Sequence, residues 1–399
     1  MPKDKPEIRF AGYTDAWEKR KLGKVANFFN GRAYKQAELL DKGKYPVLRV
    51  GNFGTNTQWY YSNMELADKF YANKNDLLYT WATAFGPHIW RGDKVIYHYH
   101  IWKIQLSDEL EENFTYWMLE ADKANLTANT NGSTMIHVTK SEMESKEISI
   151  PFKEEQLKIG KLMNKLDQLI TVNQRKVDLL KELKKGFLQK MFPKNGEDKP
   201  EIRFGGYTDA WEKRKLGEIG ETHSGIGFPE NEQGGKKGIP FFKVSDMNNF
   251  GNEHEMNVAN NYVNDDQLER KKWKVINNVP GIIFAKVGAA IMLNRKRLIK
   301  VPFLMDNNTM EYAFDRSWNV YFGKTLFETL NLPKYAQVGA LPSYNGSDIE
   351  TISVEIPEKD EQERIGTFFQ RLDQLITVNQ RRVDLLKQEK KALLQKMFV

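Results

Sequence analysis

The stretch Leu166–Phe192, LDQLITVNQRKVDLLKELKKGFLQKMF, organises this 399-residue chain, because it returns almost unchanged at Leu372–Phe398. The two copies are identical at 22 of 27 positions. A second stretch, Asp4–Gly23, recurs at Asp198–Gly217 with a single difference. Long internal repeats of this kind indicate a chain built from two copies of one structural unit.

The bodies between the repeats, residues 24–149 and 218–355, share an order of predicted elements but little sequence. Short β-like runs alternate with turn signals in the first body, at 45–50, 76–80 and 94–101. A stretch rich in Tyr and Trp at 111–121 is typical of a helix. Each body therefore predicts a mixed α+β module. Constant repeats around variable bodies indicate a shared partner for the repeats and a different ligand for each body.

Pro151 and Pro357 each stand directly before a long helical pattern and are predicted boundaries. The expected fold class is α+β, with two tandem pseudo-twofold-related modules, each followed by a long helix. The predicted parts are module one at 1–150, helix one at 151–192, a linker at 193–198, module two at 199–356 and helix two at 357–399. The two chain ends resemble the two sides of that linker, so we expect the termini to lie close together.

The repeated stretch predicts a long amphipathic helix, because its apolar residues recur at steps of three and four. The residues expected to pair the helices or dock partners are Leu166, Leu169, Asn173, Val177 and Leu180, and in the second copy Leu372, Leu375, Asn379, Val383 and Leu386. An asparagine on such a stripe costs stability but fixes the pairing register. Two ordinary core helices are the alternative. A length of about 45 Å for 30 residues favours spacer rods, paired as an antiparallel coiled coil.

The two helices carry most of the basic charge. Residues 158–191 hold nine Lys or Arg against three acids, and residues 364–397 hold eight against three. The whole chain is only +7, so the remainder is acidic. A basic rod is suited to a phosphate backbone or to acidic partner helices, and a solvated face explains the charge equally well. Two modules on a rod also suit duplex DNA read at half-sites about 34 Å apart.

The chain contains no Cys, which excludes a disulfide framework and a thiolate metal site and favours a reducing compartment. The N-terminal MPKDKPEIRF is charged and lacks the apolar core of a signal peptide. No apolar run approaches the length needed to span a bilayer. We therefore expect a cytoplasmic protein with no membrane partner.

Several motifs occur in duplicate and in the same order. They are Trp-Glu-x-x-x-Leu-Gly at 17–23 and 211–217, Ile-Pro-x-x-x-Glu-Gln at 150–156 and 356–362, and the Leu-Asp-x-Leu-Ile that begins each repeated stretch. Together with the tandem layout, these motifs resemble the DNA specificity subunit of type I restriction-modification systems. The resemblance spans essentially the whole chain.

This resemblance implies that each body is a target recognition domain, which reads one half of a bipartite site in double-stranded DNA. The helices are implied to set the gap between the halves and to dock two modification subunits. Those subunits bind S-adenosylmethionine and methylate adenine, and through them the restriction subunits, with ATP and Mg²⁺, join the complex. No cofactor or metal is expected on this chain itself.

The sequence contains no recognisable catalytic constellation. The Asn- or Asp-Pro-Pro-aromatic run of a methyltransferase and a glycine-rich cofactor loop are both missing. The acid-x-Lys pattern Glu182-Leu183-Lys184, which could suggest a nuclease, is lost in the second copy. His98 and His100 would share one face of a strand, as a metal site requires, but polar or stacking roles are the favoured interpretation. We therefore expect a non-catalytic recognition subunit.

Arg, Lys, Asn and Gln read base edges, while Ser, Thr and backbone amides position phosphates. The candidate DNA contacts in module one are Arg32, Lys35, Arg49, Trp81, Thr83, His88, Arg91, Asn131, Ser133 and Thr134. Those in module two are Lys243, Ser245, Lys286, Asn294, Arg295, Lys296, Arg297, Tyr344, Asn345 and Ser347. The cluster at 294–297 is the strongest, because adjacent cations in a turn have little packing role. For any one residue, a solvated surface position is an equally good interpretation.

Trp17 and Trp211 belong to the constant repeats and are expected to pack where each module meets its helix. The alternative function is a protein-binding scaffold, with two modules on a coiled-coil bridge. Such a scaffold shares the architecture but requires no sequence-selective DNA binding, even with its partners present.

Overall fold

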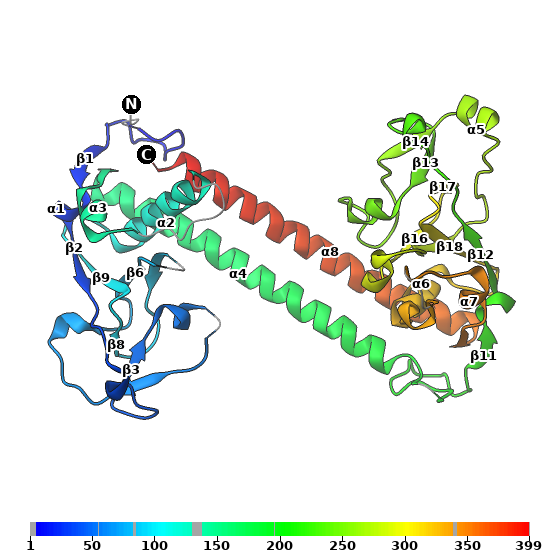
Figure 1. Ribbon diagram of the computed structural model, residues 1–399, viewed down its shortest axis with the longest axis horizontal. Helices are drawn as coiled ribbons and strands as arrows, with labels where there is room; N and C mark the ends of the chain where they lie inside the picture. The colour runs from blue at the N-terminus through cyan, green and yellow to red at the C-terminus, as the bar shows by residue number, and fades with distance from the viewer. Residues whose placement is uncertain are drawn as a thin grey trace. The chain divides into compact units, whose positions relative to one another are not determined.

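The computed structural model describes residues 5–54, 56–82, 85–129, 138–194, 196–337 and 341–398. The chain divides into two compact units, the first made of Met1–Asn173 with Arg382–Val399 and the second of Gln174–Arg381. Each unit contains one module and parts of both long helices, α4 (Lys153–Lys190) and α8 (Lys359–Lys396) (Figure 1).

The module of the first unit contains two four-stranded sheets. The first sheet is antiparallel and has the order β2 (Ala26–Asn30), β9 (Ile101–Leu106), β6 (Leu77–Thr80), β7 (Gly86–Ile89). The second has the order β4 (Tyr60–Ser62), β3 (Tyr45–Leu48), β8 (Val95–Tyr97), β5 (Tyr71–Ala72), with β3 and β8 parallel. A separate pair joins β1 (Glu18–Lys21) to β10 (Glu147–Ile150). The helices are α1 (Leu22–Val25), α2 (Glu112–Asn129) and α3 (Lys140–Ser145), with short 3-10 turns η1 (Gln36–Glu38), η2 (Val50–Phe53) and η3 (Asp68–Phe70).

The module of the second unit repeats this topology, except that no described strand of its second sheet corresponds to β5. Its first sheet has the order β12 (Gly220–Ser224), β18 (Thr309–Phe314), β15 (Gly281–Ala285), β16 (Lys296–Ile299). Its second has the order β14 (Asn261–Val263), β13 (Ile239–Phe242), β17 (Leu304–Met305), with β13 and β17 parallel. The separate pair is β11 (Glu212–Lys215) with β19 (Ser353–Ile356). The helices are α5 (Asp265–Lys271), α6 (Val320–Thr329) and α7 (Gly346–Glu350), with η4 (Leu216–Glu218), η5 (Glu230–Glu232), η6 (Val244–Asn248), η7 (Ala289–Leu293) and η8 (Leu332–Tyr335).

The predicted mixed α+β modules are confirmed, but one predicted strand is wrong. Residues 94–101 form β8, a turn at 98–100 and the first residue of β9. The aromatic and β-branched residues of this run favour strand throughout, whereas the fold reverses the chain there. His98 and His100 therefore lie on a turn and do not share one face of a strand.

The Glu-Gln of the repeated motif fixes the start of each long helix. In the first unit the Gln156 amide donates to the carbonyls of Glu109 and Pro151 and accepts from the backbone N–H of Glu111. The neighbouring Glu155 carboxylate is fully buried and receives two hydrogen bonds from Arg9, at 2.7 and 2.8 Å.

The second unit contains the same arrangement. Gln362 contacts the backbone of Pro357, Ser317 and Asn319. The buried Glu361 receives two hydrogen bonds from Arg203, at 2.6 and 2.8 Å.

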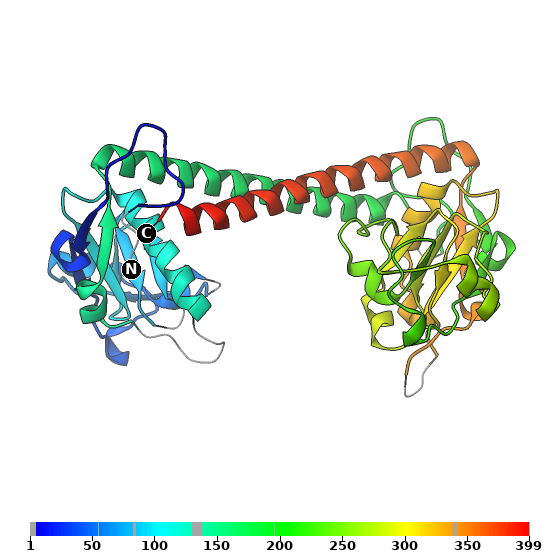
Figure 2. The ribbon, with the colours of Figure 1, turned by 90° about the horizontal axis from the view of Figure 1, so that it is seen from above.

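Helices α4 and α8 lie side by side within each unit (Figures 1 and 2). In the first unit Lys390 forms an ion pair with Asp167. In the second, Lys181 donates to Gln380 at 3.2 Å and the rings of Phe187 and Phe368 are 5.0 Å apart. Residue numbers rise on one helix as they fall on the other, so the helices are antiparallel in this unit. The coiled-coil geometry stays a prediction.

The predicted helix stripe divides into buried and exposed residues. Leu166, Val177, Leu372 and Val383 are buried, and Leu180 and Leu386 are half-buried. Leu169 and Leu375 are exposed and so do not belong to the buried seam. Asn173 and Asn379 are buried, but each side-chain amide donates to the carbonyl four residues earlier in its own helix. These bonds stay within one helix, so they do not support the expected role of the two asparagines in fixing the register between the helices.

The constant tryptophans pack where module and helix meet, as predicted. Trp17 lies in one core with Phe114 of α2, Met163 of α4 and Met397, which directly follows α8. Trp211 contacts the rings of Phe192 and Phe322 in the second unit.

The N-terminal segment contacts the end of α8, where the Ile8 N–H donates to the Lys396 carbonyl at 2.9 Å. The Ile202 N–H makes the same bond to the Lys190 carbonyl at the end of α4. The Ile8–Lys396 bond therefore places described residues near the two ends of the chain close together, as expected. No helix in the described ranges has the length and apolarity required to cross a membrane.

Candidate nucleic-acid interface

Three of the predicted DNA contacts of module one interact with other side chains of the module. Arg32 forms a two-pronged ion pair with Glu38, and Arg91 donates to the side chain of Asn75 at 2.7 Å. His88 stacks on Phe53, with ring centroids 4.0 Å apart. Burial lowers the pKa of His88 to about 4, so this imidazole is neutral at physiological pH.

Lys35 and Arg49 are exposed, and Trp81 is half-buried. Trp81 Nε1 donates to the Tyr99 carbonyl at 2.9 Å. Thr83, Asn131, Ser133 and Thr134 lie outside the described residues.

The strongest predicted cluster, residues 294–297, is built into the fold of module two. Lys296 is buried, and its ammonium donates to the Leu330 carbonyl at 2.6 Å and to the Asn294 side chain at 3.0 Å. Burial lowers the pKa of Lys296 to about 8. Arg297 Nε donates to the Asn252 carbonyl at 2.6 Å, and Arg295 donates to Asn248. The assumption that these cations have little packing role is therefore wrong.

The remaining candidates of module two occupy different environments. Tyr344 is buried, which contradicts its expected place on an accessible surface. Ser245, Asn345 and Ser347 are exposed. Asn345 precedes α7, and its backbone N–H donates to Asp348.

The two modules place cations at matching positions. Arg49 follows β3 and precedes η2, and its backbone N–H donates to the Asn52 side chain at 3.0 Å. Lys243 follows β13 and precedes η6, and its backbone N–H donates to the Asp246 side chain at 2.9 Å. These two cations occupy equivalent positions in the two modules, and neither is buried.

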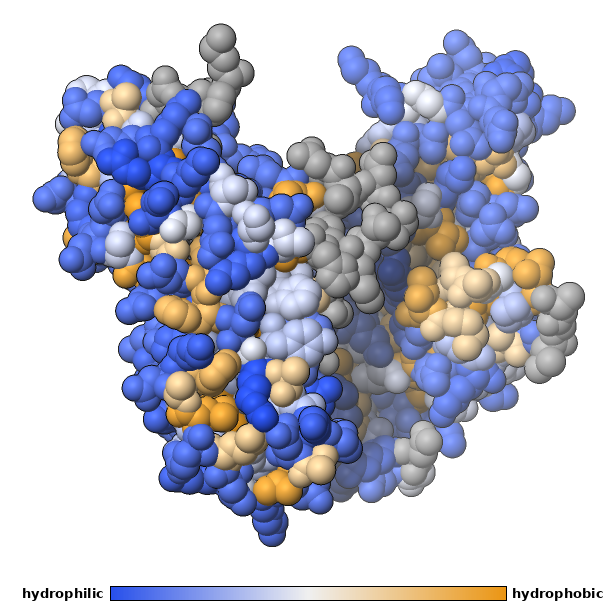
Figure 3. Space-filling view, turned by 60° about the vertical axis from the view of Figure 1, so that its left-hand side comes forward, coloured by the Kyte–Doolittle hydropathy of each residue, from blue (hydrophilic) through white to orange (hydrophobic). Residues whose placement is uncertain are grey.

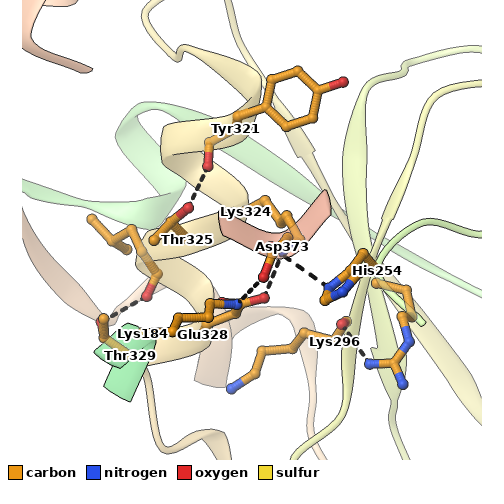
Figure 4. Close-up of polar contacts among 11 residues, drawn as sticks. Lys184, His254, Lys296, Tyr321, Lys324, Thr325, Glu328, Thr329 and Asp373 are labelled. Carbon is orange, nitrogen blue, oxygen red and sulfur yellow. Dashed lines mark hydrogen bonds and ion pairs between the residues drawn. The ribbon is translucent and has the colours of Figure 1, made fainter. Parts of the chain in front are cut away.

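Lys184, part of the acid-x-Lys pattern, belongs to a buried ionic network in the second unit (Figure 4). Its ammonium contacts Glu328 at 2.5 Å and Asp373 at 2.6 Å. Lys324 pairs with the same two carboxylates. His254 Nδ1 lies 3.6 Å from Asp373. The network joins α4, α6, α8 and the segment before β14, so it anchors the module to both helices.

His254, Glu328 and Asp373 bring their ligand atoms within 4.8 Å of one another, a spacing that could hold a metal ion. Two lysine ammonium groups already neutralise the two carboxylates, so the arrangement is better suited to ion pairing. Burial raises the pKa of both carboxyls, but Lys324 and Lys184 outweigh it and hold that pKa below its usual range. Burial also lowers the pKa of His254.

The surface seen in Figure 3 is largely hydrophilic, with hydrophobic residues in small separate groups.

A family model described as type I restriction modification DNA specificity domain matches the chain twice, at residues 14–182 and 208–388. The type I restriction enzyme MjaVIII specificity subunit of Methanocaldococcus jannaschii is 23% identical, over 95% of this chain and 91% of that protein. The type I restriction enzyme EcoBI specificity subunit of Escherichia coli is 21% identical, over 88% of this chain and 78% of that protein.

Solved structures show the same fold. The S subunit of a type I restriction-modification system from M. genitalium matches with a TM-score of 0.66 and 16% identity, covering 99% of both chains. A chain from a study of complex assembly and conformational transition in the type I R-M system matches with a TM-score of 0.54 and 14% identity, covering 96% of this chain and 97% of that one.

The repeat supplies a matched test of the ionic network, because Asp373 and Asp167 are equivalent residues. Asp373→Asn leaves two buried ammonium groups with one carboxylate and should cost about 3 kcal/mol at pH 7. Asp167 is half exposed, so Asp167→Asn should cost less than about 1 kcal/mol. Thermal and urea unfolding of both variants measures the difference, and equal costs would contradict a buried role for the network.

The same pair of variants has a predicted pH dependence. The folded-state pKa of Asp373 is lowered, so its contribution is complete above the unfolded-state pKa of about 4 and is lost as the pH falls. The cost of Asp373→Asn should therefore be constant near neutrality and shrink below about pH 4.

Proposed function

Because the chain belongs to the family of type I restriction modification DNA specificity domains, we infer that its two modules read the two halves of one bipartite DNA sequence. It is a specificity subunit of a type I restriction-modification system, the component that recognises DNA and is not itself catalytic. The observation that carries the bipartite reading is that two modules of one topology sit in nearly identical frames but have different side chains.

Exposed apolar residues occur at equivalent positions of the two long helices, which supports a role for these helices in binding partner subunits. Val172 and Val378 are equivalent and are 66% and 63% exposed. The further exposed pairs are Leu169 with Leu375 and Leu179 with Leu385. Identical docking residues in both copies favour two copies of one partner, which we propose to be the modification subunit, with restriction subunits joining through it. Large exposed apolar residues on a helix are typical of such contacts.

The two-module reading is tested by mapping methylated adenine in DNA from cells that produce the chain with a cognate modification subunit. The intact chain should give one bipartite motif. Exchange of residues 24–149 for the body of another specificity subunit should change one half of the motif only. Absence of any motif, with the complex verified, would favour the two-module protein scaffold.

The role of the helices in setting the gap predicts a second outcome in the same assay. Removing residues 174–180 together with 380–386 deletes equivalent heptads around the buried Val177 and Val383, which keeps the apolar stripe in phase. Each helix shortens by about 10 Å, or about three base-pair steps. The gap should shorten while both half-sites keep their sequence, and an unchanged gap would count against the spacer role.

Partner docking predicts a change in stoichiometry. Val172→Glu alone should leave a complex with one modification subunit in place of two, and Val172→Glu with Val378→Glu should leave none, because a charge replaces an apolar contact. Analytical ultracentrifugation with a cognate modification subunit measures the mass of each complex. Met292→Glu is the control, since Met292 is equally exposed, at 67%, but lies in a variable body. Normal complexes with both valines replaced would refute these docking sites.

A further inference from the structure

The turn between β8 and β9, residues 98–100, is held in place by backbone atoms at both ends. The His98 N–H donates to the Leu48 carbonyl at 2.9 Å, and the Trp81 N–H donates to the His100 carbonyl at 3.3 Å. Leu48 ends β3 and Trp81 follows β6, so the turn lies where the two sheets of module one meet. Backbone bonds of this kind leave the side chains of the turn open to change.

The turn between β17 and β18, residues 306–308, is held in the same way in module two. The Asp306 N–H donates to the Phe242 carbonyl at 2.9 Å, and the Lys286 N–H donates to the Asn308 carbonyl at 2.7 Å. Phe242 ends β13 and Lys286 follows β15. The two modules therefore share one turn scaffold at the same place in the topology.

In module one this scaffold presents aromatic rings. The ring centroids of Tyr99 and His100 are 3.9 Å apart, those of His98 and Tyr99 are 4.4 Å apart, and those of Trp81 and His100 are 4.9 Å apart. Tyr99 is 39% exposed although it belongs to this cluster. Burial lowers the pKa of His98 to about 4, with smaller effects of His100 and Arg49 in the same direction. Its neutral imidazole offers one donor and one acceptor.

In module two the same scaffold presents amides and charges. Asn307 and Asn308 are exposed, and the Asn308 amide donates to one oxygen of Asp306 at 3.3 Å. The other oxygen of Asp306 is buried without a hydrogen-bond partner. The Lys286 ammonium donates to Ser224 at 3.0 Å. These side chains form hydrogen bonds and offer no ring for stacking.

A cation stands near each turn. Arg49 directly follows Leu48, whose carbonyl accepts from the His98 N–H, and Lys243 directly follows Phe242, whose carbonyl accepts from the Asp306 N–H. These are the two matching cations at the starts of η2 and η6. In such an arrangement the side chains of the turn, which differ between the modules, can contact bases, and the neighbouring cation can contact a phosphate.

We propose that the turns at 98–100 and 306–308 are the base-reading elements of the two modules, each with a phosphate contact from Arg49 or Lys243. This inference rests on the proposed function. The exposed Tyr99 ring of module one matches the thymine methyl group. The amides of Asn307 and Asn308 match the adenine N6 and N7 edge, and Lys286 matches guanine O6 and N7.

The test uses the full chain with its cognate modification subunit and the methylation map of the intact protein as reference. Tyr99→Ala should relax one base pair in one half-site, and Asn307→Ala should relax one base pair in the other. The expected loss of discrimination is roughly 10- to 100-fold at that position. Tyr335→Ala and Asn277→Ala are controls, since both residues are exposed but lie away from the turns. Both control variants should reproduce the reference motif.

Equal melting temperatures of the variants and the intact chain will establish that each variant is folded. An unchanged motif in both turn variants would overturn the proposal, as would uniformly weaker methylation with the motif intact. A reference map without any bipartite motif would instead overturn the proposed function itself.

Discussion

A buried glutamate at the start of each long helix is the constraint on which both units depend. Glu155 and Glu361 are almost completely removed from water, and each is neutralised by one arginine from the repeated segment at the start of its module. Loss of either partner leaves a buried charge uncompensated, which costs about 3–5 kcal/mol. Segments far apart in the sequence are thereby held to one geometry, which accounts for near-identical repeats at both places.

The glutamine beside that glutamate explains how different bodies fit one frame. Gln156 and Gln362 bond only to backbone atoms of the body and of the preceding proline. Backbone atoms are present whatever the side chains are, so the frame holds a body without restricting its sequence. The shared sheet order of the two modules follows from the same principle, because different apolar residues can fill equivalent core positions.

The repeat made the long helices and the packing of Trp17 predictable from sequence, because these features depend on apolar periodicity and on constant residues. The α+β modules were predictable from the short β-like runs and turn signals of the bodies. The turn at 98–100 was not predictable, because its residues favour a strand. The chain turns there because β8 and β9 belong to different sheets, which the local sequence does not reveal. The burial of Lys296 was equally hidden, because its carbonyl acceptor on Leu330 lies 34 residues away. Asn307 and Asn308 had a sequence signal, because Asp306-Asn307-Asn308 is a run of turn-forming residues.

The first unit is built from two separate stretches of the chain, which has a consequence for protein synthesis. Its core includes Met397, which joins Trp17 and Met163 only after all of the second unit, Gln174–Arg381, has been synthesised. The second unit is continuous in sequence and can complete its core earlier. A nascent chain therefore carries an unfinished apolar surface on its first module while the second one folds. The unfinished first module of one nascent chain can bind the end of α8 from a second chain that is being made on a neighbouring ribosome. Slow translation at high expression should therefore favour pairs of chains that have exchanged these helix ends.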